Sequence, residues 1–151
     1  MAITIPLKFI DVGGDGFHLH AIFHIGKKPV RMVIDTGASR TVFDKQKFES
    51  ITGSSDSLLH EKLSAGIGGS GLESHVIRFS GFRLRKIELK KYQTVLMDLS
   101  HVNNSYAQMK IKEVDGILGS DIMKKFKAKI DFGKKVLVLY PPKKKSVSRR
   151  N

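Results

Sequence analysis

The sequence of 151 residues contains no cysteine. This absence excludes a disulfide-bonded scaffold, a cysteine nucleophile, thiol redox chemistry and any zinc site that needs thiolate ligands. Long apolar runs are missing too, so no segment can span a bilayer, and the N-terminus lacks a charged stretch followed by a long apolar one. We therefore expect a cytoplasmic chain with no membrane partner.

Acidic residues are scarce: 14 Asp and Glu stand against 27 Lys and Arg, which gives a formal net charge of +13. Clustered cations bind polyanions by releasing counterions, so the excess suggests nucleic acid, an acidic membrane or an acidic substrate. The charges are spread along the chain, however, and the basic stretch 143–150 has no interleaved aromatic residue for base stacking. We do not expect a nucleic-acid partner, and an acidic substrate or partner stays open.

The length allows one domain and excludes a two-lobed enzyme. Alternation at period two and turn signals predict strands at 3–10, 17–25, 30–34, 76–79, 82–89, 93–98, 115–119, 128–132 and 136–140. Short helices are predicted at 44–48, 106–111 and 122–126, the last one capped by Ser120 and Asp121. The segment 51–74, rich in Gly and Ser, is predicted to be a long loop or a mobile hairpin. These patterns predict an all-β domain over residues 3–140 and a basic, disordered tail at 141–151.

Three histidines, His18, His20 and His24, share one face of the predicted strand 17–25 and could in principle hold zinc. The other face of this strand is apolar, beginning with Phe17, so we expect the histidines to be solvated on the polar face. No nearby carboxylate or cysteine completes a set of ligands. The sequence therefore predicts no metal site.

The sharpest local signal is Asp35-Thr36-Gly37, which follows the apolar strand 30–34. Burial of an unpaired carboxylate is costly, so an Asp in this place is expected to be used or neutralised. The alternative is a turn-forming Asp that accepts hydrogen bonds from its own following amides. The triplet alone does not decide between catalysis and turn formation.

A second motif, about eighty residues later, favours catalysis. The segments 34–39 and 116–121 resemble, in this order, the catalytic loop and the apolar-apolar-Gly segment beneath it in the retropepsin-like aspartic proteases. The resemblance covers residues 3–140. It implies a single-domain acid protease fold, a closed and barrel-like all-β structure with a flap hairpin and one or two short helices.

The resemblance also implies a role for individual residues. Asp35 would be the catalytic residue, and because this chain supplies only one such triplet, two copies must meet to provide the two carboxylates that share a proton. The protein would be a homodimeric aspartic endopeptidase that hydrolyses a peptide or protein substrate without a cofactor. Support of the active-site loop is expected from Thr36, Gly37, Ala38, Ile117, Leu118 and Gly119.

The family's flap falls on the Gly-rich segment 65–71, where substrate binding is expected at Gly66, Ile67, Gly68 and Gly69. The same glycines match the dinucleotide-binding pattern G-x-G-x-x-G. That pattern requires a strand before it and a helix after it, and the sequence predicts neither. A surface loop without a role in binding is the remaining alternative.

The sequence departs from the retroviral enzymes at Ser120, where they commonly carry Arg. This change removes a charged contact expected near the dimer interface. The alternative to a protease is a catalytically silent binding or assembly module of the same fold, with an acidic or nucleic-acid partner. A third hypothesis is nucleic-acid binding by charge alone.

Overall fold

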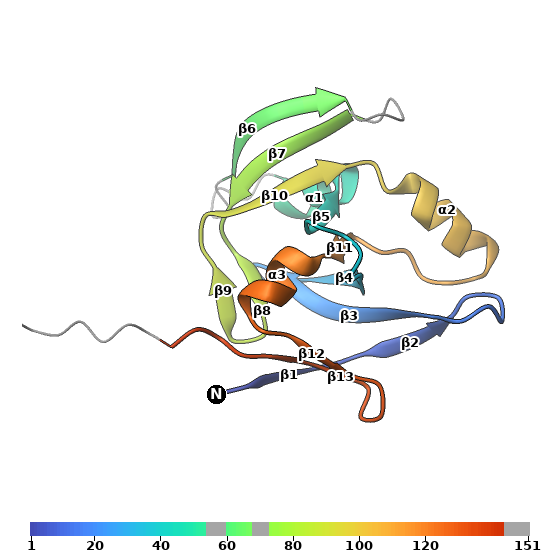
Figure 1. The fold of residues 1–151 in the computed structure, drawn as a ribbon. Coiled ribbons are helices and arrows are strands. Elements are labelled where there is room, and N and C mark those ends of the chain that lie inside the picture. Colours follow the sequence, from blue (N-terminus) through green and yellow to red (C-terminus); the bar gives the residue numbers. More distant parts are fainter. Residues whose placement is uncertain (54–59, 68–72, 144–151) are drawn as a thin grey trace, which may run out of the picture.

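The computed structural model describes residues 1–53, 60–67 and 73–143. This part of the chain contains short strands and three helices (Figure 1). The strands are β1 (Ile3–Pro6), β2 (Lys8–Asp11), β3 (Phe17–Ile25), β4 (Lys28–Ile34), β5 (Val42–Asp44), β6 (His60–Ile67), β7 (Glu73–Phe79), β8 (Phe82–Leu84), β9 (Ile87–Leu89), β10 (Tyr92–Met97), β11 (Gly116–Leu118), β12 (Lys129–Asp131) and β13 (Val136–Leu139). The helices are α1 (Lys45–Thr52), α2 (Ser100–Gln108) and α3 (Ser120–Lys125). None of these helices is long and apolar enough to cross a membrane.

The strands form two sheets. The larger sheet has the order β6-β7-β10-β5-β11-β4-β3-β8-β9, with β2 paired to β3, and the smaller one has the order β1-β13-β12. In Figure 1 the β6–β7 hairpin lies at the top and the smaller sheet at the bottom, with β3 and β4 between them. The prediction of an all-β fold is confirmed in its coarser form: the described residues are mostly strand, with three helices where the resemblance implies one or two. The described strands do not close into a barrel, because β6 and β9 end the larger sheet without pairing to each other, so that detail is not confirmed.

Aromatic side chains hold α1 against the larger sheet. Phe48 of α1 packs edge-on against Phe79 of β7 at a centroid distance of 5.0 Å, and Phe43 of β5 packs edge-on against Phe82 of β8 at 5.2 Å. All four rings are almost completely buried. Such pairs contribute about 0.5–1.5 kcal/mol beyond the burial of their area. This cluster makes β5, which precedes α1, a rigid support for the strands beside it.

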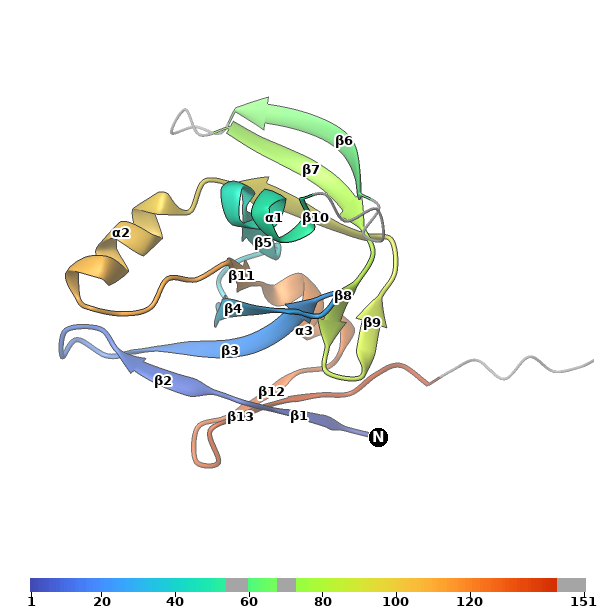
Figure 2. The ribbon, with the colours of Figure 1, turned by 180° about the vertical axis from the view of Figure 1, so that it is seen from behind.

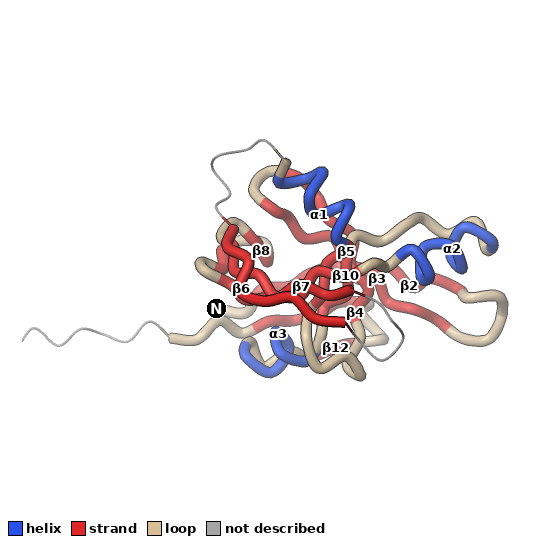
Figure 3. Tube along the Cα trace, turned by 90° about the horizontal axis from the view of Figure 1, so that it is seen from above, coloured by secondary structure: helices blue, strands red, loops and turns tan. Residues whose placement is uncertain are grey.

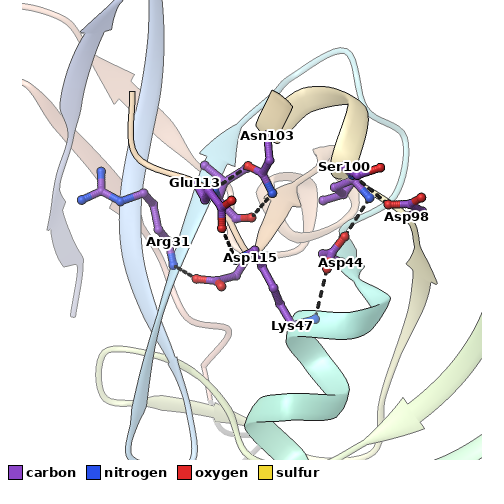
Figure 4. A network of polar contacts seen from close by, with 10 residues as sticks. Arg31, Asp44, Lys47, Asp98, Ser100, Asn103, Glu113 and Asp115 are labelled. Atoms are coloured by element: carbon purple, nitrogen blue, oxygen red, sulfur yellow. Dashed lines mark hydrogen bonds and ion pairs between the residues drawn. The ribbon is translucent and has the colours of Figure 1, made fainter. Parts of the chain in front are cut away.

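Polar contacts hold α1 and α2 to the segments beside β10 and β11 (Figure 4). Asn103, buried in α2, donates from Nδ2 to the Val114 carbonyl at 3.0 Å and accepts from the Val114 amide at 2.8 Å. The Asp44 carboxylate caps α1 through the Lys47 amide at 3.0 Å and also accepts from the Leu99 amide at 2.8 Å. These buried acceptors and donors satisfy one another, as burial requires. The segment that leads into β11 is thereby held in place.

The structure corrects several predicted elements. The predicted strand 82–89 is a hairpin, because Arg85, at a φ of +60°, and Lys86 form a two-residue turn between β8 and β9. The predicted helix 106–111 begins earlier, as α2, after Leu99, which makes no side-chain cap that a sequence pattern could reveal. Helix α3 begins at Ser120 without a side-chain cap, so the predicted cap by Ser120 and Asp121 is wrong.

The segment 51–74 contains regular structure where the structure describes it. Strand β6 pairs antiparallel with β7 and carries a bulge between Lys62 and Ser64. Of the two predicted forms, long loop or hairpin, the described residues form a hairpin. The division into a domain at 3–140 and a tail at 141–151 stays a prediction, and residues 144–151 lie outside the described part.

Candidate active site

Asp35 follows directly after β4, which lies between β3 and β11 in the larger sheet. Its amide donates to the Leu118 carbonyl at 3.0 Å, and its Oδ1 accepts from the Gly37 amide at 2.8 Å. Asp35, Thr36 and Gly37 are exposed. The Gly37 bond is the one that a turn-forming Asp would make, so this bond alone does not distinguish catalysis from turn formation.

The second motif lies directly beside the first, as the sequence predicts. Strand β11 pairs parallel with β4, which places Ile117 opposite Val33 and Leu118 opposite Ile34. Leu118 is completely buried and Ile117 is half-buried. The two motifs are thus brought together by one parallel ladder, although they are far apart in the sequence.

Gly119 passes the loop 35–40 at a distance that only glycine allows. A Cβ atom at this position would lie 2.7 Å from the Arg40 carbonyl carbon and oxygen and 2.8 Å from the Ala38 carbonyl oxygen. All three are backbone atoms, which cannot move aside as a flexible side chain can. The Ser120 amide, next in the chain, donates to the Ala38 carbonyl at 2.7 Å. Half-buried Ala38 therefore connects the loop to the start of α3.

A polar cluster that the sequence analysis did not predict anchors the far end of the loop. Thr41 donates from its amide and from Oγ1 to Asp121 Oδ1, at 3.0 and 2.8 Å, and its Oγ1 accepts from the Gly119 amide at 3.0 Å. Tyr92 donates from its hydroxyl to Asp121 Oδ2 at 2.8 Å, and burial raises the pKa of Tyr92 above its ordinary value. A phenol that stays protonated remains a donor to the carboxylate. The sequence feature that could have indicated this cluster is Thr41, a hydroxyl residue between the loop 35–40 and the apolar strand that follows it.

A cavity of about 420 Å³ adjoins Asp35 and Thr36. Its walls are mostly apolar and come from β3, β4, α2, β11 and β12. Two of its lining side chains, Phe17 and Phe132, are 62% and 64% exposed, although large apolar side chains are normally covered. Phe9 lies between them, with ring centroids 6.2 Å from Phe17 and 5.3 Å from Phe132. The prediction that Phe17 belongs to the buried face of its strand is therefore wrong.

Two histidines and a tyrosine form a chain of hydrogen bonds at the edge of this cavity. The Tyr106 hydroxyl lies 2.7 Å from His18 Nδ1 and 3.1 Å from His20 Nε2. His20 is only 1% exposed, and burial, followed by the positive charge of Arg31, lowers the pKa of His20 to about 4. The prediction that all three histidines are solvated is wrong for His20, because Tyr106 of α2 covers it.

Each atom of this chain of hydrogen bonds can be assigned as donor or acceptor. Nδ1 of His20 is buried without a partner among the described residues. A proton on Nε2 lets neutral His20 donate to Tyr106, and the hydroxyl of Tyr106 can then donate to His18 Nδ1. With the proton on Nδ1 instead, His20 would bury an N–H group that has no acceptor. Burying this unsatisfied donor costs more free energy than burying an unprotonated ring nitrogen that has no donor. In this arrangement Nδ1 of His18, which lines the cavity, is the acceptor at the end of the chain.

The predicted flap residues lie apart from this cavity in the structure. Gly66 and Ile67 end β6 at the tip of the β6–β7 hairpin, while Gly68 and Gly69 lie outside the described residues. No residue of β6 or β7 lines the cavity beside Asp35. Figure 2, seen from behind, shows this hairpin above the rest of the larger sheet.

The aspartyl protease family model matches residues 21–122, a range that includes both motifs. The chain belongs to this family. No curated protein sequence matches the chain at a significant level.

Similarity to solved structures identifies the fold. The chain is similar to a retropepsin-like aspartic protease from Rickettsia conorii, with 20% sequence identity, coverage of 93% of this chain and 91% of that one, and a TM-score of 0.56. It is also similar to the retroviral protease-like domain of Ddi1 from Leishmania major, with 14% identity, coverage of 81% and 87%, and a TM-score of 0.55. The family match and these similarities confirm the predicted resemblance to retropepsin-like proteases.

Proposed function

We propose that this member of the aspartyl protease family is an endopeptidase that hydrolyses peptide bonds with the Asp35 carboxylates of two identical subunits. The observation that carries the proposal is the position of Asp35. Its side chain is exposed at a mostly apolar cavity, on a loop whose backbone is fixed by Leu118 and Ser120. A carboxylate on a rigid support is what acid and base catalysis requires, because its geometry must persist through proton transfer.

A single carboxylate cannot act as base and acid at once. In the proposed reaction one Asp35 accepts a proton from the attacking water, while the protonated Asp35 of the second subunit polarises the carbonyl of the scissile bond. Two carboxylates close together share one proton, because both cannot ionise at that distance. The Gly37 amide, bonded to Asp35 Oδ1, would hold the carboxylate during the exchange.

The surface around Asp35 suits a second copy of the chain. Asp35 and Thr36 are exposed, and the exposed rings of Phe17 and Phe132 line the same cavity. Full burial of an exposed Phe side chain is worth roughly 1.5–3 kcal/mol, so covering the parts of Phe17 and Phe132 that are exposed favours association by about 1–2 kcal/mol each. We place the two-fold axis beside Asp35, with Thr36 bonded across it. The β6–β7 hairpin, in which Gly66 and Ile67 end β6, would cover the substrate as a flap, while Gly68 and Gly69 of this prediction lie outside the described residues.

A catalytically silent module of the same fold is the second candidate. It is favoured by one observation: the Gly37 amide already satisfies Asp35 Oδ1 within a single chain, as in an ordinary turn. Such a module needs no second carboxylate and can be monomeric.

The Asp35→Asn variant tests the proposal. It should abolish cleavage in a peptide library while the fold, measured by circular dichroism, and the dimer, measured by sedimentation, stay intact. Glu49→Gln is the matched control, because Glu49 is an exposed carboxylate of α1, and no residue of α1 lines the cavity. Unchanged turnover in Asp35→Asn, or a wild-type monomer that stays monomeric with a pepstatin-like inhibitor, would refute the dimeric protease.

A further inference from the structure

A second cavity, of about 880 Å³, lies away from Asp35. It shares no lining residue with the cavity at Asp35. Its residues come from the N-terminal end of β1, from β3, and from the β8–β9 hairpin. Figures 1 and 2 both show the N-terminal end of β1 and this hairpin on the same side of the molecule, opposite to α2. We call this cavity the basic groove.

The basic groove runs between two strands that each have an unpaired edge. Strand β1 pairs only with β13, and β9 pairs only with β8, within the described part of the chain. Ile3 and Thr4 of β1 and Ile87 of β9 line the groove. A free strand edge presents backbone N–H and C=O groups that can pair with another extended chain. Figure 3, seen from above, shows the N-terminus close to β8, as the other views do.

Cations gather along the same groove. Arg83, Arg85 and Lys86 line it and are exposed, and His24, opposite Arg83 in the β3–β8 ladder, is half-buried. None of the three cations forms an ion pair among the described residues. Glu88 faces Arg83 across the β8–β9 ladder but does not reach ion-pair distance. Three unneutralised charges side by side attract an anionic ligand.

The remaining lining favours a peptide over a nucleic acid. Ile3, Ile87 and Pro141 contribute apolar surface between the cations. Among the described residues no Phe, Tyr or Trp lines the groove, and the ring of His24 is half-buried, so bases would find little on which to stack. Backbone pairing at a strand edge is open to an extended peptide and not to a sugar-phosphate chain.

We propose that the basic groove binds an acidic protein segment in extended conformation. Its backbone pairs with the free edge of β1 or β9, and its carboxylates contact Arg83, Arg85 and Lys86. The site is separate from Asp35 and does not depend on the proposed protease function. It assigns a specific role to three of the 27 Lys and Arg residues of the chain.

The test measures binding of a fluorescein-labelled peptide of alternating Glu and Val residues by fluorescence anisotropy. The full chain carries Asp35→Asn, so that the peptide is not cleaved. The ionic strength is held at about 0.15 M. The groove variant combines Arg83→Gln, Arg85→Asn and Lys86→Gln. The matched control combines Lys110→Asn, Lys112→Gln and Lys124→Gln, three exposed cations outside the groove.

The two variants remove the same charge and make similar demands on the backbone. Arg85 and Lys110 both have a positive φ, +60° and +58°, and Asn tolerates this conformation better than most residues. The groove variant should weaken binding about tenfold, as expected for three charge contacts at a partly solvated site, and the control by less than about twofold. Glu88→Gln should strengthen binding, because it removes the acidic residue opposite Arg83.

Two further probes separate strand pairing from charge. The same peptide with a methylated backbone cannot pair with a strand edge and should bind much more weakly. Single-stranded oligothymidine of equal charge should also bind more weakly and without dependence on the groove residues. Equal losses in the two triple variants, equal binding of the methylated peptide, tighter binding of oligothymidine, or no binding to the unsubstituted groove would each overturn the proposal.

Discussion

Buried His20 makes the stability of the fold depend on pH in a direction that can be worked out. The ring is 1% exposed, and burial, with the positive charge of Arg31 as the next cause, lowers the pKa of His20 from 6.5 to about 4. In the unfolded chain the pKa returns to its ordinary value. As the pH falls below 6.5, the unfolded chain binds a proton that the folded chain does not, so the free energy of unfolding decreases. The decrease levels off below pH 4, where both states are protonated.

The size of the effect follows from the two pKa values. Each pH unit between them changes the free energy of unfolding by about 1.4 kcal/mol, which amounts to about 3 kcal/mol by pH 4. This is a large part of the 5–15 kcal/mol that stabilises an ordinary domain. The Tyr106 hydroxyl, which accepts from His20 Nε2 in the neutral state, connects the effect to the cavity at Asp35.

The variant His20→Gln tests this prediction. The amide of glutamine can replace Nε2 as donor to Tyr106 and does not titrate in this range. Urea unfolding of both proteins at pH 7.5 and pH 4.5 should show that the wild type loses roughly 2 to 3 kcal/mol more than the variant. His101→Gln, at an exposed position of α2, is the control and should behave as the wild type. Equal losses in wild type and His20→Gln, or an NMR titration of His20 with a midpoint near its ordinary pKa, would refute the reasoning.

Two further variants test the support of the active-site loop. Gly119→Ala should destabilise the fold by about 2 kcal/mol or more, because its Cβ would clash with backbone atoms of Arg40 and Ala38. The control Gly66→Ala should change stability little, because the nearest atom to its Cβ lies at 4.0 Å. Equal losses of stability in the two variants, measured by urea unfolding, would contradict this prediction. Asp121→Asn should lower the free energy of unfolding by about 2 kcal/mol, since the carboxylate accepts three hydrogen bonds from Thr41 and Tyr92. Tyr92→Phe should lower it by about 1 kcal/mol, since it removes one of these bonds. A larger decrease in Tyr92→Phe than in Asp121→Asn would show that the carboxylate is not the centre of the cluster.

The parts of the fold that were predictable are those in which local pattern and tertiary structure agree. The strand 17–25 has the predicted bounds, since its turn signals and alternation are undisturbed. The adjacency of Asp35 and the 117–119 segment was predictable only because two motifs were recognised together. Neither motif alone indicates a parallel pairing between β4 and β11.

The parts that were missed depend on side chains from distant elements. Period two assigns His20 to a polar face, but α2 brings Tyr106 over that face, so the ring is buried. Asp121 was assigned to a helix cap because short-range patterns favour it, and yet its carboxylate binds Thr41, eighty positions away. The turn at Arg85 was missed because Arg is an unusual residue at positive φ.

The two cavities assign different tasks to different parts of one small domain. At Asp35 the chain offers one carboxylate, a fixed loop and exposed aromatic side chains, and in the proposed protease a second copy would supply the second Asp35. The basic groove shares no lining residue with that cavity and lies on the side of the molecule opposite to α2, where Arg83, Arg85 and Lys86 adjoin two strand edges that are unpaired among the described residues. A protein held in the groove by an acidic segment would be retained on the surface of the proposed protease. Catalysis and retention could therefore be removed separately, by Asp35→Asn on one side and by the groove variant on the other.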